Sequence, residues 1–256
     1  MAAARVIVTR PAREAARWVD DLRAAGLDAV ALPLIAIEPL EDPEALHSAW
    51  QRLPDYDALM FVSAAAVEHF FRGIDASAAA RARFWGTGPG TTRALQEAGV
   101  PVSSIDAPPA DAAQFDSEAL WALVRPQVRP GTRVLIVRGG DASGRISGRD
   151  WLAREIAAAG GAFDEVTAYR RLAPTFGEAE HHLAAEAASG RAVWLFSSSE
   201  AIANLCRCMP DTRWNAARAI ATHERIADAA RVAGFGSVRV SSPSPLALVA
   251  SIESLA

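Results

Sequence analysis

The sequence contains an internal repeat, and this repeat limits the folds open to the chain more than any other feature. Residues 58–67 (ALMFVSAAAV) and 192–202 (AVWLFSSSEAI) each pass from an apolar run through serine into helix-forming residues. Residues 86–99 and 221–234 form a second such pair. The aligned residues are Ser63 with Ser198, Thr87 with Thr222, and Gly99 with Gly234. Two copies of one strand–turn–helix scheme predict two domains of the same fold.

Short apolar runs alternate with alanine-rich amphipathic stretches. Residues 6–8 predict a strand, 12–25 a helix that stops at Gly26, and 29–32 a second strand closed by Pro33. Similar runs and stretches follow at 58–62, 64–71, 91–98, 134–137, 149–159 and 193–196. This alternation is typical of parallel sheets covered by helices on both faces. The predicted fold is therefore α/β, with two similar flavodoxin-like or Rossmann-like domains.

Two extended stretches with prolines, 32–43 and 168–177, separate regions of different composition. If the two stretches pair, the second domain is inserted into the first. The first domain is then residues 1–35 plus 174–256, the second is 44–166, and the linker strands are 36–43 and 167–173. A two-stranded crossing predicts a hinge with a cleft between the domains.

Composition indicates a soluble protein, because 51% of the residues are hydrophobic and 22% charged, with no apolar run of the roughly 18 residues that a membrane span needs. The first residues lack the pattern of a secretory leader, which predicts a cytoplasmic protein. Cys206 and Cys208 are the only cysteines, and their spacing suggests neither a disulfide framework nor a metal site. No metal is expected.

The net charge of −4 argues against a general nucleic-acid binder. All 26 basic residues are arginine, since the sequence contains no lysine. The arginine fork matches carboxylates with two hydrogen bonds, although a GC-rich genome is the simpler explanation of a lysine-free chain.

Ligands of open α/β sheets lie beyond the carboxyl ends of the strands, where loops lead into helices. Six loops of this kind carry small or hydroxylated residues: 9–11 (TRP), 63–66 (SAAA), 88–91 (GPGT), 138–140 (RGG), 197–199 (SSS) and 222–223 (TH). Each can offer backbone N–H groups and a helix dipole to an anion. In any one loop, helix capping explains the serine or threonine more simply. The set of six favours a ligand with carboxylates or phosphates.

Other motifs point to no further chemistry. GTGPGT at 86–91 departs from the dinucleotide fingerprint, because Pro89 interrupts the glycines and Thr91 takes the sixth position. His181 and His182 lie among glutamates and fit a solvated helix face better than a metal site. His223 is equally consistent with a binding donor and with a residue that merely begins a helix.

Tyr169 lies at the edge of the predicted crossing. A phenol there can donate a hydrogen bond to a leaving hydroxyl without ionising, since its ordinary pKa is about 10. A tyrosine packed for structure at a hinge is equally consistent with this position.

Eight short motifs follow one another along nearly the whole chain: TRP at 9–11, LPLI at 32–35, FVS at 61–63, GPGT at 88–91, VRG at 137–139, GRDWL at 148–152, YRR at 169–171 and THERIA at 222–227. In order and spacing they resemble the uroporphyrinogen-III synthase family. The resemblance implies a cyclising lyase that removes water from hydroxymethylbilane and closes it to uroporphyrinogen III with ring D inverted. It implies no cofactor, and a place in heme, siroheme or cobalamin biosynthesis.

The resemblance also implies roles for single residues. Tyr169 matches the tyrosine that assists departure of the hydroxyl, and Thr91 matches a binding-loop threonine. Together with the strand-end loops, this gives the expected substrate-binding residues Thr9, Arg10, Ser63, Gly88, Thr91, Arg138, Gly139, Ser197, Ser198, Thr222 and His223.

The sequence departs from the family in two places. Residues 223–226 are HERI where relatives often have Gly-Pro-Thr-Thr, so a threonine role there passes to Thr222 or His223. The turn at 141–144 is less glycine-rich, which leaves open whether Arg145 or Arg149 corresponds to the family arginine.

As partners we expect the bilane substrate and a transient contact with hydroxymethylbilane synthase, with no nucleic acid and no membrane, and we expect a monomer. The alternative function is a cytoplasmic two-domain binding module for a polycarboxylate.

Overall fold

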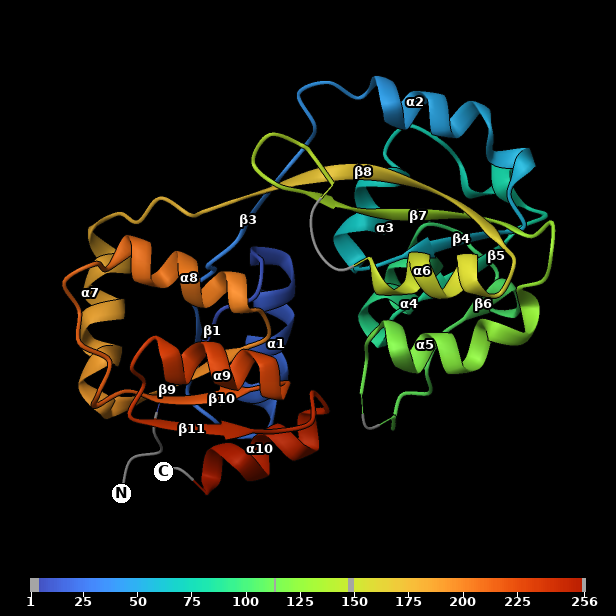
Figure 1. Cartoon of the computed structure of the whole chain (residues 1–256). Helices are drawn as coiled ribbons and strands as arrows, with labels where there is room; N and C mark the ends of the chain where they lie inside the picture. The colour runs from blue at the N-terminus through green and yellow to red at the C-terminus, as the bar shows by residue number, and fades with distance from the viewer. Residues whose placement is uncertain (1–4, 113, 147–149, 255–256) are drawn as a thin grey trace. The chain divides into compact units, whose positions relative to one another are not determined.

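The computed structural model of the chain describes residues 5–112, 114–146 and 150–254, and their strands form two sheets (Figure 1). The first sheet contains β1 (Arg5–Val8), β2 (Ala29–Ala31), β9 (Ala192–Phe196), β10 (Arg218–Ala221) and β11 (Ser237–Val240). The second contains β3 (Ala36–Glu38), β4 (Ala58–Phe61), β5 (Arg83–Gly86), β6 (Ile105–Asp106), β7 (Arg133–Gly140) and β8 (Ala162–Leu172). The pairs β1 with β2 and β9, and β4 with β5 and β7, are parallel, which confirms the predicted α/β class.

The two sheets share one spatial order of strands. The first runs β2-β1-β9-β10-β11, which is the flavodoxin-type order 2-1-3-4-5. Without its edge strand β3, the second runs β8-β7-β4-β5-β6. Strands β4 and β9 therefore occupy equivalent places, as do β5 and β10. These four strands carry the internal repeat. The chain reaches equivalent places in a different order in the two sheets, because β1 and β2 precede β9 whereas their counterparts β7 and β8 follow β4.

Helices connect the strands: α1 (Ala12–Ala24), α2 (Glu44–Gln51), α3 (Ala64–Phe70), α4 (Pro89–Glu97), α5 (Ser117–Val124), α6 (Trp151–Ala158), α7 (Glu178–Glu186), α8 (Ser199–Cys208), α9 (Glu224–Val232) and α10 (Pro245–Glu253). None of the helices in the described ranges combines the length and the apolar character that a membrane span requires. After α1, α4 and α9 the chain turns through Gly26, Gly99 and Gly234, whose φ angles of 85°, 88° and 93° suit glycine.

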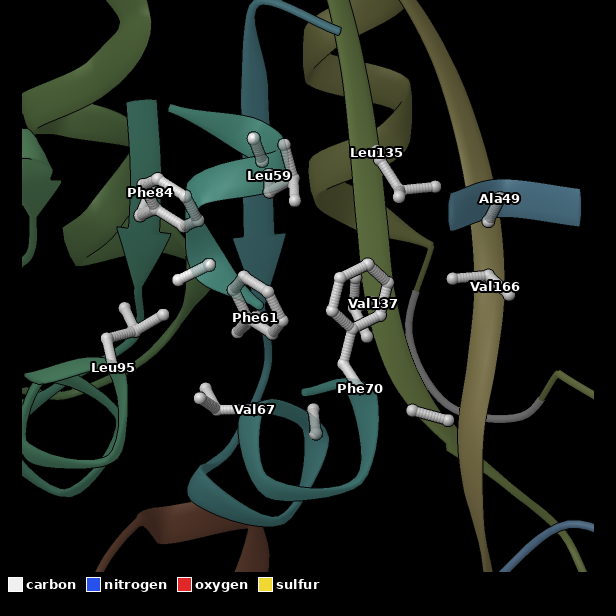
Figure 2. Close-up of a cluster of buried hydrophobic side chains, with 14 of the residues drawn as sticks. Ala49, Leu59, Phe61, Val67, Phe70, Phe84, Leu95, Leu135, Val137 and Val166 are labelled. Atoms are coloured by element: carbon white, nitrogen blue, oxygen red, sulfur yellow. The ribbon is translucent and has the colours of Figure 1, made fainter. Parts of the chain in front are cut away.

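The second sheet is buried on both faces, which explains its continuous apolar runs. Leu59, Phe61, Leu135 and Val137 pack with side chains of α3 and α4, including Phe70 and Leu95 (Figure 2). The alternate residues Ala58, Met60, Val134 and Ile136 pack with Leu120 of α5 and Leu152 of α6. Successive side chains of a strand point to opposite faces, so each run serves two cores.

Several observed bounds differ from the sequence prediction. Helix α4 begins at Pro89 rather than at residue 91, because proline suits the first turn of a helix. Strand β8 spans 162–172, so the segment expected to be a linker from 167 onward continues a strand of the sheet. The predicted helix start at Arg149 lies outside the described residues, as do Gly148 and residues 1–4.

The chain divides into two compact units, Met1–Ala36 with Leu172–Ala256, and Ile37–Arg171. It passes from one to the other twice, once at β3 and once at the end of β8, and these two strands are neighbours in the second sheet. The predicted domain limits at 35, 44, 166 and 174 stay predictions.

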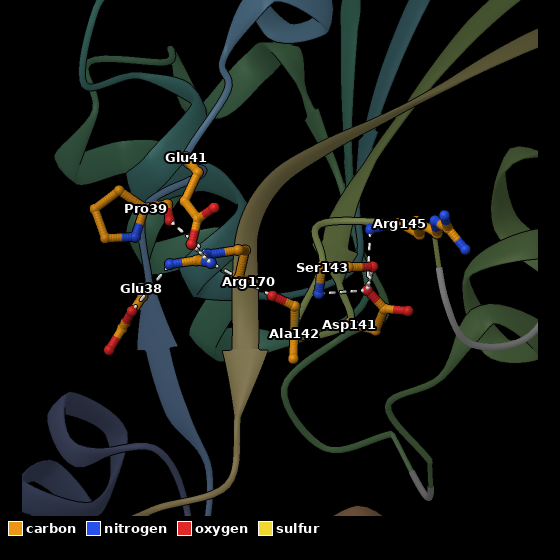
Figure 3. Close-up of polar contacts among 8 residues, drawn as sticks. All are labelled: Glu38, Pro39, Glu41, Asp141, Ala142, Ser143, Arg145 and Arg170. Atoms are coloured by element: carbon orange, nitrogen blue, oxygen red, sulfur yellow. Dashed lines mark hydrogen bonds and ion pairs between the residues drawn. The ribbon is translucent and has the colours of Figure 1, made fainter.

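Arg170 joins the segments of the two crossings (Figure 3). From β8, its guanidinium forms ion pairs with Glu38, at 3.2 Å, and with Glu41, and its Nε donates to the carbonyl of Pro39 at 3.1 Å. It also donates to the carbonyl of Ala142 at 3.4 Å. One side chain therefore ties β8 to the segment around β3 and to the turn after β7.

Candidate active site

Each sheet has a topological switch point, where successive connections leave in opposite directions, and ligands of open α/β sheets generally bind at this point beyond the carboxyl ends of the strands. In the second sheet this point lies between β4 and β7, and in the first it lies between β1 and β9. The predicted residues Ser63, Arg138 and Gly139 lie at the first of these points. Thr9, Arg10, Ser197 and Ser198 lie at the second.

Tyr169 lies on β8, beside the end of β7. The pairing of these strands is irregular between Arg138 and Gly139, so that Arg138 faces Thr167 while Gly139 faces Tyr169. The Tyr169 side chain is 4% exposed, and its ring lies directly against Gly139. A Cβ atom at Gly139 would lie 2.4 Å from the Tyr169 Cζ, so only glycine accommodates the ring.

Ser63 links this phenol to helix α3. The Oγ of Ser63 lies 3.2 Å from the Oη of Tyr169 and accepts a hydrogen bond from the Ala66 N–H at 3.1 Å. Either hydroxyl can donate in this pair, because Ser63 Oγ keeps its own proton and one lone pair after accepting from the backbone.

His69 is a neighbour of Tyr169 that the sequence reasoning missed. Its ring centroid lies 5.5 Å from that of Tyr169, at an interplanar angle of 45°, and its side chain is 6% exposed. Burial, and to a lesser degree the charge of Arg72, lower the pKa of His69 to about 4. Its place three residues after Ala66 and next to Phe70, on the apolar face of α3, is the signal that could have marked it as buried.

Gly88 and Thr91 lie at the start of α4. A Cβ at Gly88 would meet the Cβ of Phe115 at 2.9 Å, so this glycine allows a close approach of the 115 loop. Thr91 is buried, and its hydroxyl lies 3.4 Å from that of Thr87, which donates to the carbonyl of Val62 at 3.2 Å. These hydroxyls connect the loops that follow β4 and β5.

Arg138 is 7% exposed and pairs with Glu165, with 2.6 Å between Nη1 and Oε1. Glu165 therefore balances the Arg138 charge within the sheet. A carboxylate of a ligand would share this guanidinium with Glu165.

In the first unit, two of the expected residues cap helices. Ser198 accepts from the Glu200 N–H at 3.2 Å and His223 Nδ1 from the Arg225 N–H at 3.1 Å. In the second unit, Ser63 caps α3 in the same way. In the structure these residues are thus N-caps, as the simpler explanation expects. Each helix start still has other backbone N–H groups that an anion can reach.

Thr9, Arg10 and Thr222 also have structural contacts. Thr9 is 1% exposed, and its hydroxyl donates to the carbonyl of Leu195 at 2.7 Å, which joins the ends of β1 and β9. Arg10 pairs with Glu14 at 2.9 Å and lies 4.2 Å from the Trp18 ring. Thr222 is buried at the end of β10. Among the described residues, no side chain caps the start of α1 or of α4, both of which follow strand ends.

The segment SSPSP at 241–245 was not considered in the sequence reasoning. Ser241 follows β11, where its hydroxyl lies 2.9 Å from that of Ser251, and Ser244 caps α10. In the turn after β7, Asp141 Oδ1 accepts from the N–H groups of Ser143 and Arg145 (Figure 3). Arg149, the alternative to Arg145, lies outside the described residues.

Known proteins of one family resemble this chain. The family model described as "Uroporphyrinogen-III synthase HemD" matches residues 16–250. A uroporphyrinogen-III synthase of Chlorobaculum parvum is 31% identical over 179 residues, 66% of this chain and 65% of that protein. The porphyrin biosynthesis protein HemD of Ruminiclostridium josui is 29% identical over 101 residues, 38% of this chain and 20% of that protein.

Two solved structures share the fold. A mutant uroporphyrinogen III synthase of Thermus thermophilus superposes with a TM-score of 0.57 at 19% identity, covering 99% of both chains. The uroporphyrinogen-III synthetase of Helicobacter pylori gives 0.61 at 15% identity, covering 99% of this chain and 100% of that one. The family match spans all but the ends of the sequence, and the chain therefore belongs to the uroporphyrinogen-III synthase family.

Proposed function

We propose that this chain catalyses the reaction for which its family is named. Hydroxymethylbilane would lose its terminal hydroxyl as water and close to uroporphyrinogen III with ring D inverted, without a cofactor or a metal. The observation that carries the proposal is the Tyr169 phenol, which lies against Gly139 and within 3.2 Å of the Ser63 hydroxyl at the switch point of the second sheet.

The bond that breaks joins the terminal methylene carbon to its hydroxyl oxygen. The pyrrole nitrogen supplies the electron pair that expels this oxygen, and the N–H proton is then lost, which leaves an azafulvene. In this step Tyr169 donates a hydrogen bond to the departing oxygen, and the Ser63 hydroxyl, 3.2 Å from the phenol oxygen, helps to hold the phenol in place. The substituted α-carbon of the last ring then attacks this electrophilic methylene carbon, and a spiro intermediate forms as the azafulvene nitrogen regains a proton. The bond from the α-carbon to its original methylene bridge breaks, the bridge carbon bonds instead to the free α-carbon of the same ring, and loss of the proton from that carbon gives the closed macrocycle with ring D inverted. Holding the bilane in this geometry is the larger part of catalysis.

The bilane carries acetate and propionate groups on every ring, so its binding requires many anion contacts. We assign these contacts to the strand-end residues of both units: Thr9, Arg10, Ser63, Gly88, Thr91, Arg138, Gly139, Ser197, Ser198, Thr222 and His223. The starts of α1 and α4, where no side-chain cap is seen in the described residues, support this assignment because such N–H groups attract carboxylates.

The experiment that tests the proposal measures the isomers of the product. Freshly prepared hydroxymethylbilane is incubated with the protein, and the oxidised porphyrins are separated chromatographically. We expect an excess of the type III isomer over the type I ring that forms spontaneously. An unchanged isomer ratio would overturn the proposal, and saturable bilane binding without conversion would instead favour the polycarboxylate-binding module.

We further propose that the protein acts as a cytoplasmic monomer and receives the bilane through transient contact with hydroxymethylbilane synthase. Sedimentation equilibrium tests the oligomeric state, and we expect one chain per particle. A coupled assay, with and without an excess of inactive synthase as competitor, tests the transfer. A rate that does not change with the competitor would contradict direct transfer.

A further inference from the structure

We infer that His69 is a positioning residue for Tyr169, whose buried ring restrains the phenol so that its hydroxyl points toward the leaving group. The inference rests on the proposed ring-closing function. Its basis is the place of His69 in the packing around Tyr169, at a centroid distance of 5.5 Å.

Tyr169 is restrained at three places. Gly139 lies under the ring, Ser63 lies beside the hydroxyl, and His69 packs on the ring from helix α3. Rotation of a phenol about its own long axis leaves the oxygen in place, whereas a swing about the Cα–Cβ bond moves the oxygen by several ångströms. A neighbour that packs on the ring opposes this swing.

The geometry of the pair is that of an aromatic contact. A centroid distance of 5.5 Å and a tilt of 45° fall within the range that such pairs prefer. The imidazole is nearly fully buried, next to Phe70, which enters the core of the second sheet. A ring at position 69 thus connects the core side of α3 to the phenol.

A positioning role and a purely structural role predict different kinetics. A residue that only supports the fold changes the amount of active protein when it is replaced, and kcat per folded molecule stays the same. A residue that aims Tyr169 affects the bond-breaking step, so kcat falls while KM, which reflects the many carboxylate contacts, changes little.

The kinetic test compares three variants. His69→Ala removes the ring and His69→Phe restores a ring of similar shape, while His47→Ala is a control at an exposed histidine. His47 also belongs to the second unit and packs on an aromatic ring, that of Trp50, with centroids 5.0 Å apart at 39°. We expect His69→Ala to lower kcat about tenfold with KM within about twofold. We expect His69→Phe to recover most of the loss and His47→Ala to match the wild type.

A second measurement needs no substrate. The sequence has two tyrosines, Tyr56 and Tyr169, so labelling with ¹³Cζ-tyrosine gives two resonances, and Tyr56→Phe assigns them. We expect His69→Ala to shift or broaden the Tyr169 resonance, and His47→Ala to leave it unchanged. Should His69→Ala fail to fold, His69→Leu keeps the apolar volume without the ring and replaces it in both tests.

The outcomes distinguish a failure of the proposed ring-closing function from a failure of the positioning role of His69. The wild-type isomer ratio is measured first, and the absence of excess type III product would overturn the proposed function. If the wild type is active, a His69→Ala variant with wild-type kcat and an unchanged Tyr169 resonance would overturn the inference alone. Loss of kcat in the alanine variant with no recovery by phenylalanine would also overturn it.

Discussion

Replacing Tyr169 by phenylalanine removes the hydroxyl and keeps the ring. The contacts of the ring with Gly139 and His69 are then kept, and the contact of the oxygen with Ser63 is lost. We predict that Tyr169→Phe lowers kcat about 10- to 100-fold and leaves product affinity nearly unchanged. General acid catalysis contributes about 100- to 10,000-fold, and a pyrrole that expels the hydroxyl by itself needs only the lower part of that range. Steady-state assays and a product-binding titration check both quantities.

The other tyrosine provides the control. Tyr56 is also buried, but its hydroxyl donates to Asp164 at 2.8 Å, among residues that none of the predicted loops contains. Tyr56→Phe should lower stability and keep kcat. Equal activity of Tyr169→Phe and the wild type would remove the leaving-group role from Tyr169.

His69 also makes stability depend on pH. Its pKa of about 4 in the folded protein lies below the value of 6.5 expected for the unfolded chain, so between these pH values the unfolded state binds more protons. Stability should therefore fall as the pH is lowered from 6.5 to 4, by up to about 3 kcal/mol at about 1.4 kcal/mol per pKa unit. Urea unfolding of wild type and His69→Phe across this range measures both free energies of unfolding. As the pH falls, the wild type should lose stability relative to His69→Phe, which lacks the titrating ring. A constant difference would contradict the prediction.

At the residue scale, the sequence identified strand-end residues but not their partners. Ser63 and Tyr169 were both expected in the site, and the structure places their hydroxyls 3.2 Å apart. His69 was missed because its burial depends on how α3 packs, which a single histidine does not reveal. The Arg138–Glu165 pair joins two neighbouring strands, and their register includes an irregularity that no sequence pattern indicated.

At the level of elements, a second polar cluster stabilises the amino-terminal part of the second sheet. Asp164 on β8 accepts from the Tyr56 hydroxyl at 2.8 Å, from Arg52 at 3.0 Å and from Arg133 at 3.4 Å. The hydrogen bond from Tyr56, followed by the two guanidinium charges, holds the pKa of Asp164 below its usual range. Burial, and then the Asp164 carboxylate, raise the pKa of Tyr56 to about 12.

Asp164→Asn should lower stability at pH 7, because the carboxylate is favoured in the folded state. A depressed carboxyl pKa stabilises the fold above the unfolded value of about 4, and this contribution is lost as the pH falls through the folded value. We expect about 1 kcal/mol or less at pH 7, since the Asp164 side chain is 41% exposed and water screens its charges. Urea unfolding should show a larger difference at pH 7 than at pH 3, because the contribution is lost only as the pH falls through the lowered pKa of Asp164.

The matched control is Asp150→Asn. Asp150 pairs with Arg154 at 3.2 Å at the start of α6, where both side chains are mostly exposed. Its replacement should change stability little at either pH, because exposed pairs contribute almost nothing. A loss as large as that of Asp164→Asn would show that carboxylate charge in general, and not this cluster, is responsible.

The sequence predicted elements well where an apolar pattern continues over many residues and a glycine or proline ends it, as at α1 and Gly26. It did less well with short strands and with β8, whose first residues, 162–166, were not expected to be a strand. Strand order follows from pairing between distant segments, so the repeat indicated the equivalence of β4 and β9 but not the permuted order of the sheets.

On the scale of the whole molecule, Arg170 joins the two crossings of the chain in addition to the pairing of β3 with β8. We predict that Arg170→Met speeds amide hydrogen exchange in residues 36–41 and 168–172, because the ion pairs with Glu38 and Glu41 and the bond to the Pro39 carbonyl are lost. Exchange followed by mass spectrometry measures this change. Arg154→Met removes an exposed helical ion pair and should leave both segments unchanged. Unaltered exchange in Arg170→Met would mean that backbone pairing alone holds the crossings.

The permuted order of the strands also determines when each part of the nascent chain can fold. Strands β4 to β8 are contiguous in the sequence, so all of them are synthesised before β9. Strand β1 pairs with β9, and the bond between Thr9 and Leu195 joins residues 186 positions apart. Strand β1 can pair with β2 as soon as residues 29–31 are made, but its other edge waits for residues 192–196 of β9. That apolar edge therefore stays open while the whole second sheet is synthesised, and during translation it needs protection from aggregation.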